Sequence, residues 1–446
     1  MAISDRRLIA HLLRRAGFGT TASELDAYAA LGFTGAVNQL VDYSQVSDDS
    51  VEAQVAFMEN SLDLTKLESI QQIWLYRMLN TARPLQEKMT LFWHDHLANA
   101  NSKVGKPDAM YRQNQFFRSN ALGDFPGILR GISRDPAMIR FLDGNTNRKG
   151  APNENYAREL MELFTMGRGN YSETDVREGA RAFTGWNLDK NFQFTFNAKQ
   201  HDDGLKTFLN QRGKWNGDDV VRIILEQPVS ARFMASKLFN FFVHDHPSST
   251  TIQDLADQFR DNGFRVRELV RAIFLSADFA SDDAYHAVIR SPVEYVIGLM
   301  KSFGIPQFLP GITGSLSRMG MQLFNPPGVA GWDWGTAWIG TNTYLERVNL
   351  ANTLTSQRGE NAGRGIDPAA MARQLGAITP HGLVDGLLRV LGDGDVDSSV
   401  RDALIDYASS GYSGPAEGFF DSAQRLDRAV RGIAHLIASS PVAQMA

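Results

Sequence analysis

Apolar residues recur at spacings of three and four along most of the chain. Segments with this pattern include LESIQQIWLYRMLN, RPLQEKMTLFWHDHLA, ARFMASKLFNFFV and SPVEYVIGLMKSFG. The spacing matches the α-helix, in which residues three and four apart share one face. Thr21 followed by Glu24, and Ser172 followed by Asp175, have the pattern of helix N-caps. These patterns predict a mainly α protein, a multi-helix bundle of two packed lobes.

One segment departs from the helical period. Phe192, Phe194 and Phe196 alternate with polar residues, and KTFLNQRG follows a turn-like HDDG sequence. Alternation of this kind is typical of a half-buried strand. We therefore expect a small β-hairpin inserted between helices at residues 186–215.

The segment from Gln357 to Asp367 is rich in Gly and Asn, which indicates a linker. A chain of 446 residues is also long for one hydrophobic core. We expect a main helical domain over residues 1–356, which carries the hairpin, and a C-terminal helical subdomain over residues 367–446 packed on it.

Composition excludes several classes of protein. The net charge of −5, with both signs spread along the chain, argues against nucleic-acid binding, and no apolar run is long enough for a membrane span. Cysteine is absent, which excludes disulfides and thiolate metal sites. The first residues lack a signal peptide, so we expect a cytoplasmic protein, or a periplasmic or exported one if a leader has been removed.

The segment NENYARELMELF places polar and apolar residues on opposite faces of one helix. Its polar face carries Asn155, Arg158, Glu159 and Glu162. An ordinary surface helix has the same pattern. If another lobe covers this face, Glu159 and Glu162 repel each other at i and i+3, and the pKa of one of them rises into the range of a general acid or base.

Histidines in the segment FWHDH are candidates for a metal site. His94 and His96 are two residues apart and could both chelate from an extended or helix-end backbone. On a regular helix they point in different directions, and His96 then lies on an apolar stripe as a hydrogen-bonded, partly buried histidine. Both interpretations remain open.

Two further segments carry candidate chemistry. HDDGLKTF places His201 and Lys206 beside a turn, and loops on a rigid frame often carry catalytic groups, although turn formation alone also favours Asp-Asp-Gly. The Pro/Gly-rich segment from Leu323 to Asn349 holds Trp332, Trp334 and Trp338, which could stack on a sugar or fill a gap between lobes.

The motifs RRAGFG, FWHDH, NENYARELMELFTMG, GARAFTGW, HDDGLKTF and FNPPGVAGW occur in this order, and with them the chain resembles the bacterial domain-of-unknown-function 1800 family. The resemblance implies a mostly helical fold, a bacterial source and a sulfatase-like companion protein as a partner. It implies no settled activity. It places the polar residues above inside family motifs, which favours a buried polar cluster over a surface helix.

We therefore expect a hydrolase or transferase that acts on a polar or anionic small molecule or a glycan. The expected catalytic residues are Glu159, Glu162 and His201. The expected substrate-binding residues are Arg158, Arg181, Lys206, Asn155 and Trp186. The cofactor expected at this site is a divalent metal, with His94 and His96 as its ligands. The main alternative is a non-catalytic binding or assembly module whose buried charges are structural. A haem or flavin protein is a weaker third alternative.

Overall fold

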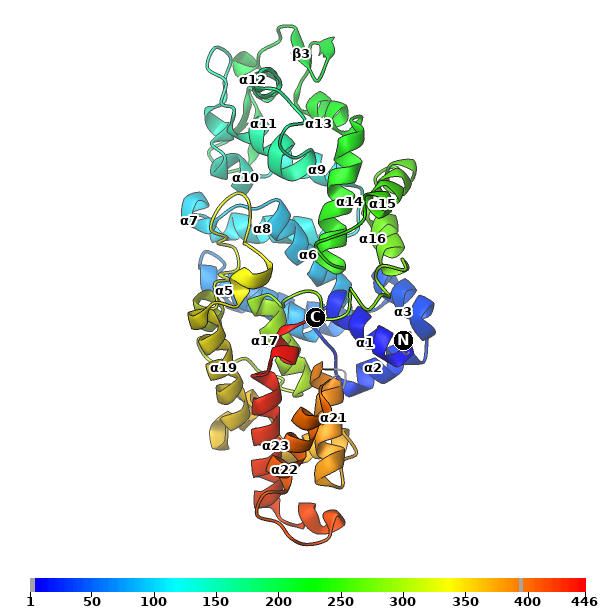
Figure 1. The fold of residues 1–446 in the computed structure, drawn as a ribbon. Helices are drawn as coiled ribbons and strands as arrows, with labels where there is room; N and C mark the ends of the chain where they lie inside the picture. The colour runs from blue at the N-terminus through cyan, green and yellow to red at the C-terminus, as the bar shows by residue number, and fades with distance from the viewer. Residues whose placement is uncertain (1–4, 393–395) are drawn as a thin grey trace.

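The computed structural model describes residues 5–392 and 396–446. It is mainly helical, as the hydrophobic spacing predicts, and it is elongated (Figure 1). Helix α12 and strand β3 lie at one end, and helices α22 and α23 lie at the other. None of the helices in the described residues is long and apolar enough to cross a membrane.

The N-terminal helices lie near the middle of the elongated molecule (Figure 1). They are α1 (Asp5–Arg15), α2 (Ala22–Ala29), α3 (Gly32–Val41), α4 (Asp49–Ser61) and α5 (Leu67–Asn80). Thr21 begins α2 through a capping box with Glu24, as the sequence predicts.

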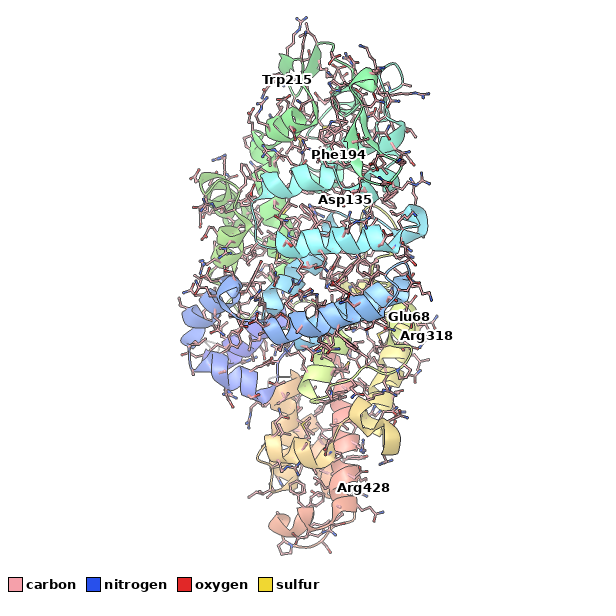
Figure 2. The ribbon with its side chains drawn as sticks, turned by 180° about the vertical axis from the view of Figure 1, so that it is seen from behind. Glu68, Asp135, Phe194, Trp215, Arg318 and Arg428 are labelled. Atoms are coloured by element: carbon pink, nitrogen blue, oxygen red, sulfur yellow. The ribbon has the colours of Figure 1, made fainter. Side chains whose placement is uncertain are left out.

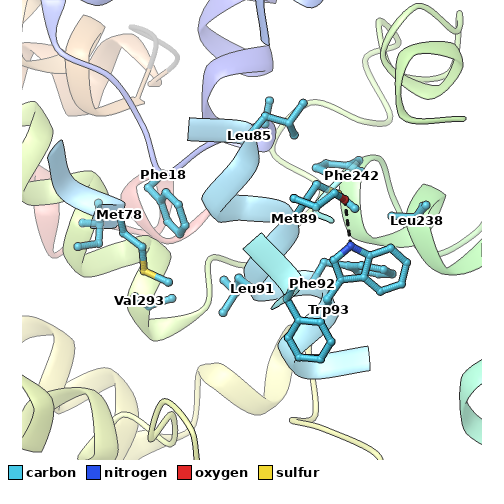
Figure 3. Close-up of a cluster of buried hydrophobic side chains, with 14 of the residues drawn as sticks. Phe18, Met78, Leu85, Met89, Leu91, Phe92, Trp93, Leu238, Phe242 and Val293 are labelled. Carbon is cyan, nitrogen blue, oxygen red and sulfur yellow. Dashed lines mark hydrogen bonds between the residues drawn. The ribbon is translucent and has the colours of Figure 1, made fainter. Parts of the chain in front are cut away.

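Helix α6 (Pro84–His96) is the central helix: Pro84 and Asp95 are half-buried, and all its other residues are buried. Figure 3 shows why: Phe18, Met78 and Val293 lie to one side of it, and Leu238 and Phe242 lie to the other. Because other helices cover it on both sides, α6 lies in the core, and its buried charged side chains Glu87 and Lys88 have partners there. The helices that follow it are α7 (Asn101–Val104), α8 (Pro107–Ser119), α9 (Phe125–Ser133) and α10 (Pro136–Phe141).

A buried ion pair joins α6 to α17 (Pro292–Ser302). Lys88 donates to Glu294, and the two side chains are 3% and 6% exposed. Glu294 also accepts a hydrogen bond from the backbone N–H of Ser291 at 2.7 Å. The pair fixes how these helices lie relative to each other, because neither charge is stable in the core alone.

The upper end of the molecule in Figure 1 contains the NEN segment and the strands. Its elements are α11 (Asn155–Glu159), a π-helix (Leu160–Thr165), α12 (Glu173–Ala182), β1 (Trp186–Leu188), β2 (Phe194–Phe196), β3 (Lys206–Phe208), β4 (Gln211–Gly213) and α13 (Gly217–Leu225). The predicted hairpin is present as two antiparallel hairpins, one of β1 and β2 and one of β3 and β4. Phe194 and Trp215 are labelled in this half in Figure 2, with Arg428 at the opposite end.

Helix α14 (Pro228–Phe242) runs from the upper end towards α1, and the Arg15 side chain donates hydrogen bonds to the carbonyls at its C-terminus. The Arg15 Nε donates to the carbonyl of Phe242 at 2.8 Å, and its Nη2 donates to the carbonyl of Val243. These carbonyls have no partner within the helix, so a buried cation at this end is stabilising. Arg15 of the RRAGFG motif therefore positions α14.

Of the remaining elements, α14 runs down from the upper end in Figure 1, α15 and α16 lie beside it, and the later helices lie in the lower half. They are α14 (Pro228–Phe242), α15 (Ser249–Asp261), α16 (Val266–Phe274), α17 (Pro292–Ser302), α18 (Ile312–Arg318), α19 (Thr341–Ser356), α20 (Pro368–Gln374), α21 (Pro380–Gly392), α22 (Ser398–Ser409), α23 (Ala423–Ala438) and α24 (Pro441–Gln444). The predicted linker includes a 3-10 helix at Gly359–Arg364. The Tyr344 hydroxyl of α19 donates to the carbonyl of Ser439 at 2.5 Å, so the C-terminal helices are tied to the main body.

Candidate functional site

A cavity of about 540 Å³ lies between α6, α14 and the tryptophan loop, which we define as residues 325–338. Its walls include the side chains of Phe92, Asp95, His96, Leu163, Lys237, Phe241, Trp332, Trp334 and Thr336. Aromatic walls with a few polar groups are typical of ligand sites in proteins. The cavity joins the FWHDH, NEN and FNPPGVAGW segments, which are far apart in the sequence.

Asp95 is the polar residue at the centre of this arrangement. Its Oδ1 accepts from the backbone N–H of Trp332 at 2.8 Å, and its Oδ2 accepts from the indole Nε1 of Trp334 at 2.7 Å. Burial nevertheless raises the pKa of Asp95 from 3.8 to about 6, because these two bonds only partly replace the lost water. The carboxyl can therefore exchange a proton near neutral pH.

The tryptophan loop reaches Asp95 because Gly331 has no side chain. Its φ is +81°, and a Cβ at this position would lie 2.3 Å from Asp95 Oδ1. Trp334 then packs edge-on against Phe241, with 5.3 Å between the ring centroids. The glycine of the VAGW sequence thus allows the aromatic wall and the carboxyl to meet.

His96 borders the same cavity and is held from two sides. Its ring stacks on Phe92 with an angle of 9° between the planes, and its Nε2 is 3.0 Å from the carbonyl oxygen of Phe164. Burial lowers the pKa of His96 to about 3, so the ring is neutral at physiological pH.

His94 points away from this cavity into the core. Its Nε2 accepts a hydrogen bond from the backbone N–H of Phe324 at 3.0 Å, and its ring packs edge-on against Trp74. Burial lowers its pKa to about 3. Over residues 5–392 and 396–446, no group of three or more His, Cys, Asp or Glu side chains is arranged to hold a metal ion. Metal binding by His94 and His96 stays a prediction, with no third protein ligand in that range.

Lys237 supplies the positive charge of the cavity. It comes from α14, its side chain is exposed, and its ammonium lies 5.5 Å from the ring centre of Phe233. Among the described residues it forms no salt bridge, although its charge lowers the pKa of the nearby Asp95 carboxyl. Its charge is therefore available to an anionic group on a ligand.

The predicted residues of the NEN helix form a separate group of ion pairs. Arg158 binds Glu173 at 2.8 Å and Glu154 at 3.0 Å, and it does not pair with Glu162. Glu162 instead accepts from Arg168 and from the hydroxyl of Tyr171.

The pKa values of the carboxyls of Glu159 and Glu162 in this helix shift in opposite directions. Burial and the nearby charge of Glu162 raise the pKa of Glu159. Hydrogen bonds from Tyr171 and Arg168 lower the pKa of Glu162. Asn155 is exposed at the start of the helix. These side chains lie near one another, but the walls of the cavity described above do not include them.

The predicted residues of the HDDG segment form another group. Arg181 binds Asp202 and Glu178, each at 2.8 Å. Lys206 is buried and donates to the carbonyls of Asp202 and Gly204. These contacts join α12 to the turn before β3.

His201 and Trp186 lie in the packing around the hairpins. The His201 Nδ1 is 2.8 Å from the carbonyl oxygen of Thr184, and its ring packs edge-on against Phe196. Trp186 is buried against Phe183, and the guanidinium of Arg134 lies 4.6 Å from the centre of its ring.

Sequence reasoning missed Asp95 and Lys237 as site residues. The contact between Asp95 and Trp332 spans 237 positions, and no local pattern predicts it. One signal was present, since Asp95 is a lone acid near the end of a helix that is otherwise almost entirely buried. An acid at a helix C-terminus opposes the dipole and needs another reason to be there.

No curated protein and no solved structure matches the chain. A family model matches residues 11–445, nearly the whole length, and it is described as Protein of unknown function (DUF1800). The motifs that line the cavity and the motifs of the ion-pair groups all fall within the matched range. The chain therefore belongs to the family of proteins of unknown function designated DUF1800.

Proposed function

We propose that this protein is a hydrolase or transferase whose ligand binds in the cavity between α6, α14 and the tryptophan loop. One observation carries the proposal: neighbouring residues Asp95 and His96 both reach the wall of a 540 Å³ cavity that Lys237 also lines. A proton-exchanging carboxyl, a neutral imidazole and a cation in one concavity are the groups that hydrolysis and group transfer use.

Each group has a distinct role in this proposal. Asp95 acts as the general acid or base, and the N–H groups of Trp332 and Trp334 stabilise its carboxylate once the proton has left. Lys237 binds an anionic group of the ligand. Trp334 and Phe241 pack against the apolar face of the ligand.

A second candidate function is a binding module without catalysis. Both oxygens of Asp95 are engaged by the tryptophan loop, which favours a structural tie that holds an aromatic wall in place. A glycan or another polar ligand would then stack on Trp334. The sulfatase-like companion protein stays a prediction from the family resemblance, and the cellular compartment stays a prediction from the sequence.

Activity measurements separate these functions. Purified protein is assayed with 4-nitrophenyl esters, glycosides and phosphates, and the enzyme proposal predicts turnover of at least one class. Asp95→Asn should then lower kcat by about 10²-fold or more, which is the usual contribution of a general acid or base. Asp254→Asn, which changes an exposed acid on α15 outside the cavity walls, is the matched control and should keep the rate.

Two further variants test the assignment of roles. Lys237→Met should raise KM for an anionic probe and leave kcat nearly unchanged, because the ammonium binds the ligand without taking part in the reaction. Glu159→Gln tests the site on the NEN helix. Full activity of Asp95→Asn with loss of activity in Glu159→Gln would overturn the cavity as the active site.

A further inference from the structure

The NEN helix changes its geometry next to the cavity. After α11, residues Leu160–Thr165 form a π-helix. The N–H of Met166 donates to the carbonyl of Met161 at 2.8 Å, five residues back, and the Thr165 hydroxyl donates to the carbonyl of Leu160. π-Helical turns are rare, and they occur frequently at functional sites because they redirect backbone groups.

Within this turn, the carbonyl of Phe164 is directed at His96 of α6. The oxygen lies 3.0 Å from Nε2 of the imidazole. A carbonyl oxygen only accepts hydrogen bonds, so Nε2 carries the proton of the neutral ring and Nδ1 carries the lone pair. The backbone of one family motif thus selects the tautomer of a histidine in another.

The other nitrogen of His96 is open to a ligand. Of the described residues, none hydrogen-bonds Nδ1, and this atom is not sealed from solvent. His96 lines the cavity, so the open side of its ring faces that space. The His96 ring stacks on the ring of Phe92, and this contact keeps it from turning. Figure 3 labels Phe92 on α6.

We infer that the π-helix at Leu160–Thr165 fixes His96 so that Nδ1 accepts a hydrogen bond in the cavity, and that the ligand presents an O–H or N–H donor to this atom. Phe164, through its carbonyl, and Thr165, through its hydroxyl, are positioning residues. The ligand class rests on the proposed function, because it requires the cavity to be the binding site. The tautomer does not depend on that proposal.

Nitrogen-15 NMR of protein labelled at histidine tests the tautomer. His96→Gln identifies the His96 signals by their loss. The inference expects a protonated Nε2 and an unprotonated Nδ1 in the wild type. A protonated Nδ1, or a fully protonated ring at neutral pH, would overturn it.

Two variants of Thr165 test the role of the π-helix. Thr165→Val removes the hydroxyl at almost the same volume, and it should produce a measurable second tautomer of His96. Thr165→Ser keeps the hydroxyl and should preserve the wild-type signals. An unchanged tautomer in Thr165→Val would contradict a positioning role for Thr165, and the wild-type spectrum remains decisive if that variant does not fold.

A matched pair of small probes tests the ligand class. tert-Butanol carries a hydroxyl donor, and methyl tert-butyl ether has a similar shape without one. At high millimolar concentration, the alcohol should shift the Nδ1 signal of His96 and the ether should not. An equal response to both, or no response to the alcohol, would refute a ligand that donates a hydrogen bond to Nδ1, while leaving the tautomer result intact. Loss of kcat in Asp95→Asn is an independent readout of the proposed function.

Discussion

Replacement of Asp95 by asparagine should change how the stability of the protein depends on pH. Burial raises the pKa of Asp95 from 3.8 to about 6, so the folded protein keeps this proton over a range in which the unfolded chain has lost it. For a carboxyl with a raised pKa, the stability is greatest below 3.8 and falls as the pH rises towards 6. The difference between 3.8 and 6 corresponds to about 3 kcal/mol at about 1.4 kcal/mol per pH unit.

The amide side chain of the Asp95→Asn variant cannot ionise, so this pH-dependent loss should disappear. The amide also has one acceptor oxygen in place of two, which lowers the stability by an amount that does not depend on pH. The wild type should therefore lose about 3 kcal/mol relative to the variant between about pH 4 and about pH 7, and the difference should be constant above that range.

Urea unfolding followed by tryptophan fluorescence at several pH values from about 4 to about 8 measures this difference. Asp254→Asn is the control, because Asp254 is an exposed acid on α15 that is not among the charges shifting the pKa of Asp95, so its substitution should leave this pH dependence unchanged. A difference between wild type and Asp95→Asn that stays constant across this range, or that grows in favour of the wild type as the pH rises, would refute the raised pKa of this carboxyl.

Three further substitutions test the packing that positions the site. Lys88→Met should lower the free energy of unfolding by about 3–5 kcal/mol, because Glu294 is left buried without its cation. Lys88→Met combined with Glu294→Gln should recover part of this loss. No recovery in denaturant titrations would contradict the pairing. Gly331→Ala should lower the melting temperature, since the new Cβ would lie 2.3 Å from Asp95 Oδ1. Gly328→Ala is the control and should change the melting temperature little, because no atom lies within 4 Å of a Cβ at that position. Equal effects of the two substitutions would count against the close approach. Thr21→Ala should cost about 1 kcal/mol by removing the N-cap of α2, which urea unfolding can measure; an unchanged midpoint would rule that cap out as stabilising.

Local patterns were enough to predict the helices and their starts. The RPLQEKMTLFWHDHLA segment is α6, and the capping boxes at Thr21 and Ser172 are both present. These features depend on residues within one or two helical turns, so the sequence contains them directly. The alternating phenylalanines likewise predicted β structure, although only the structure shows two hairpins.

The cavity depends on contacts that no local pattern contains. Asp95 meets the tryptophan loop, and Arg15 meets the carbonyls of Phe242 and Val243, only after the chain has folded. The π-helix is equally hidden, because LMELFT has the composition of an ordinary α-helix. Sequence reasoning therefore found the FWHDH motif and weighed its histidines, but it gave the acid between them no role.

A crystal structure of the protein with the product of a turned-over probe tests the location of the active site most directly. We expect product in the cavity between α6 and α14, with polar atoms within hydrogen-bond distance of the Asp95 carboxyl and the His96 ring. Product bound at Glu159 and Glu162 on the NEN helix, with the cavity empty, would contradict this assignment.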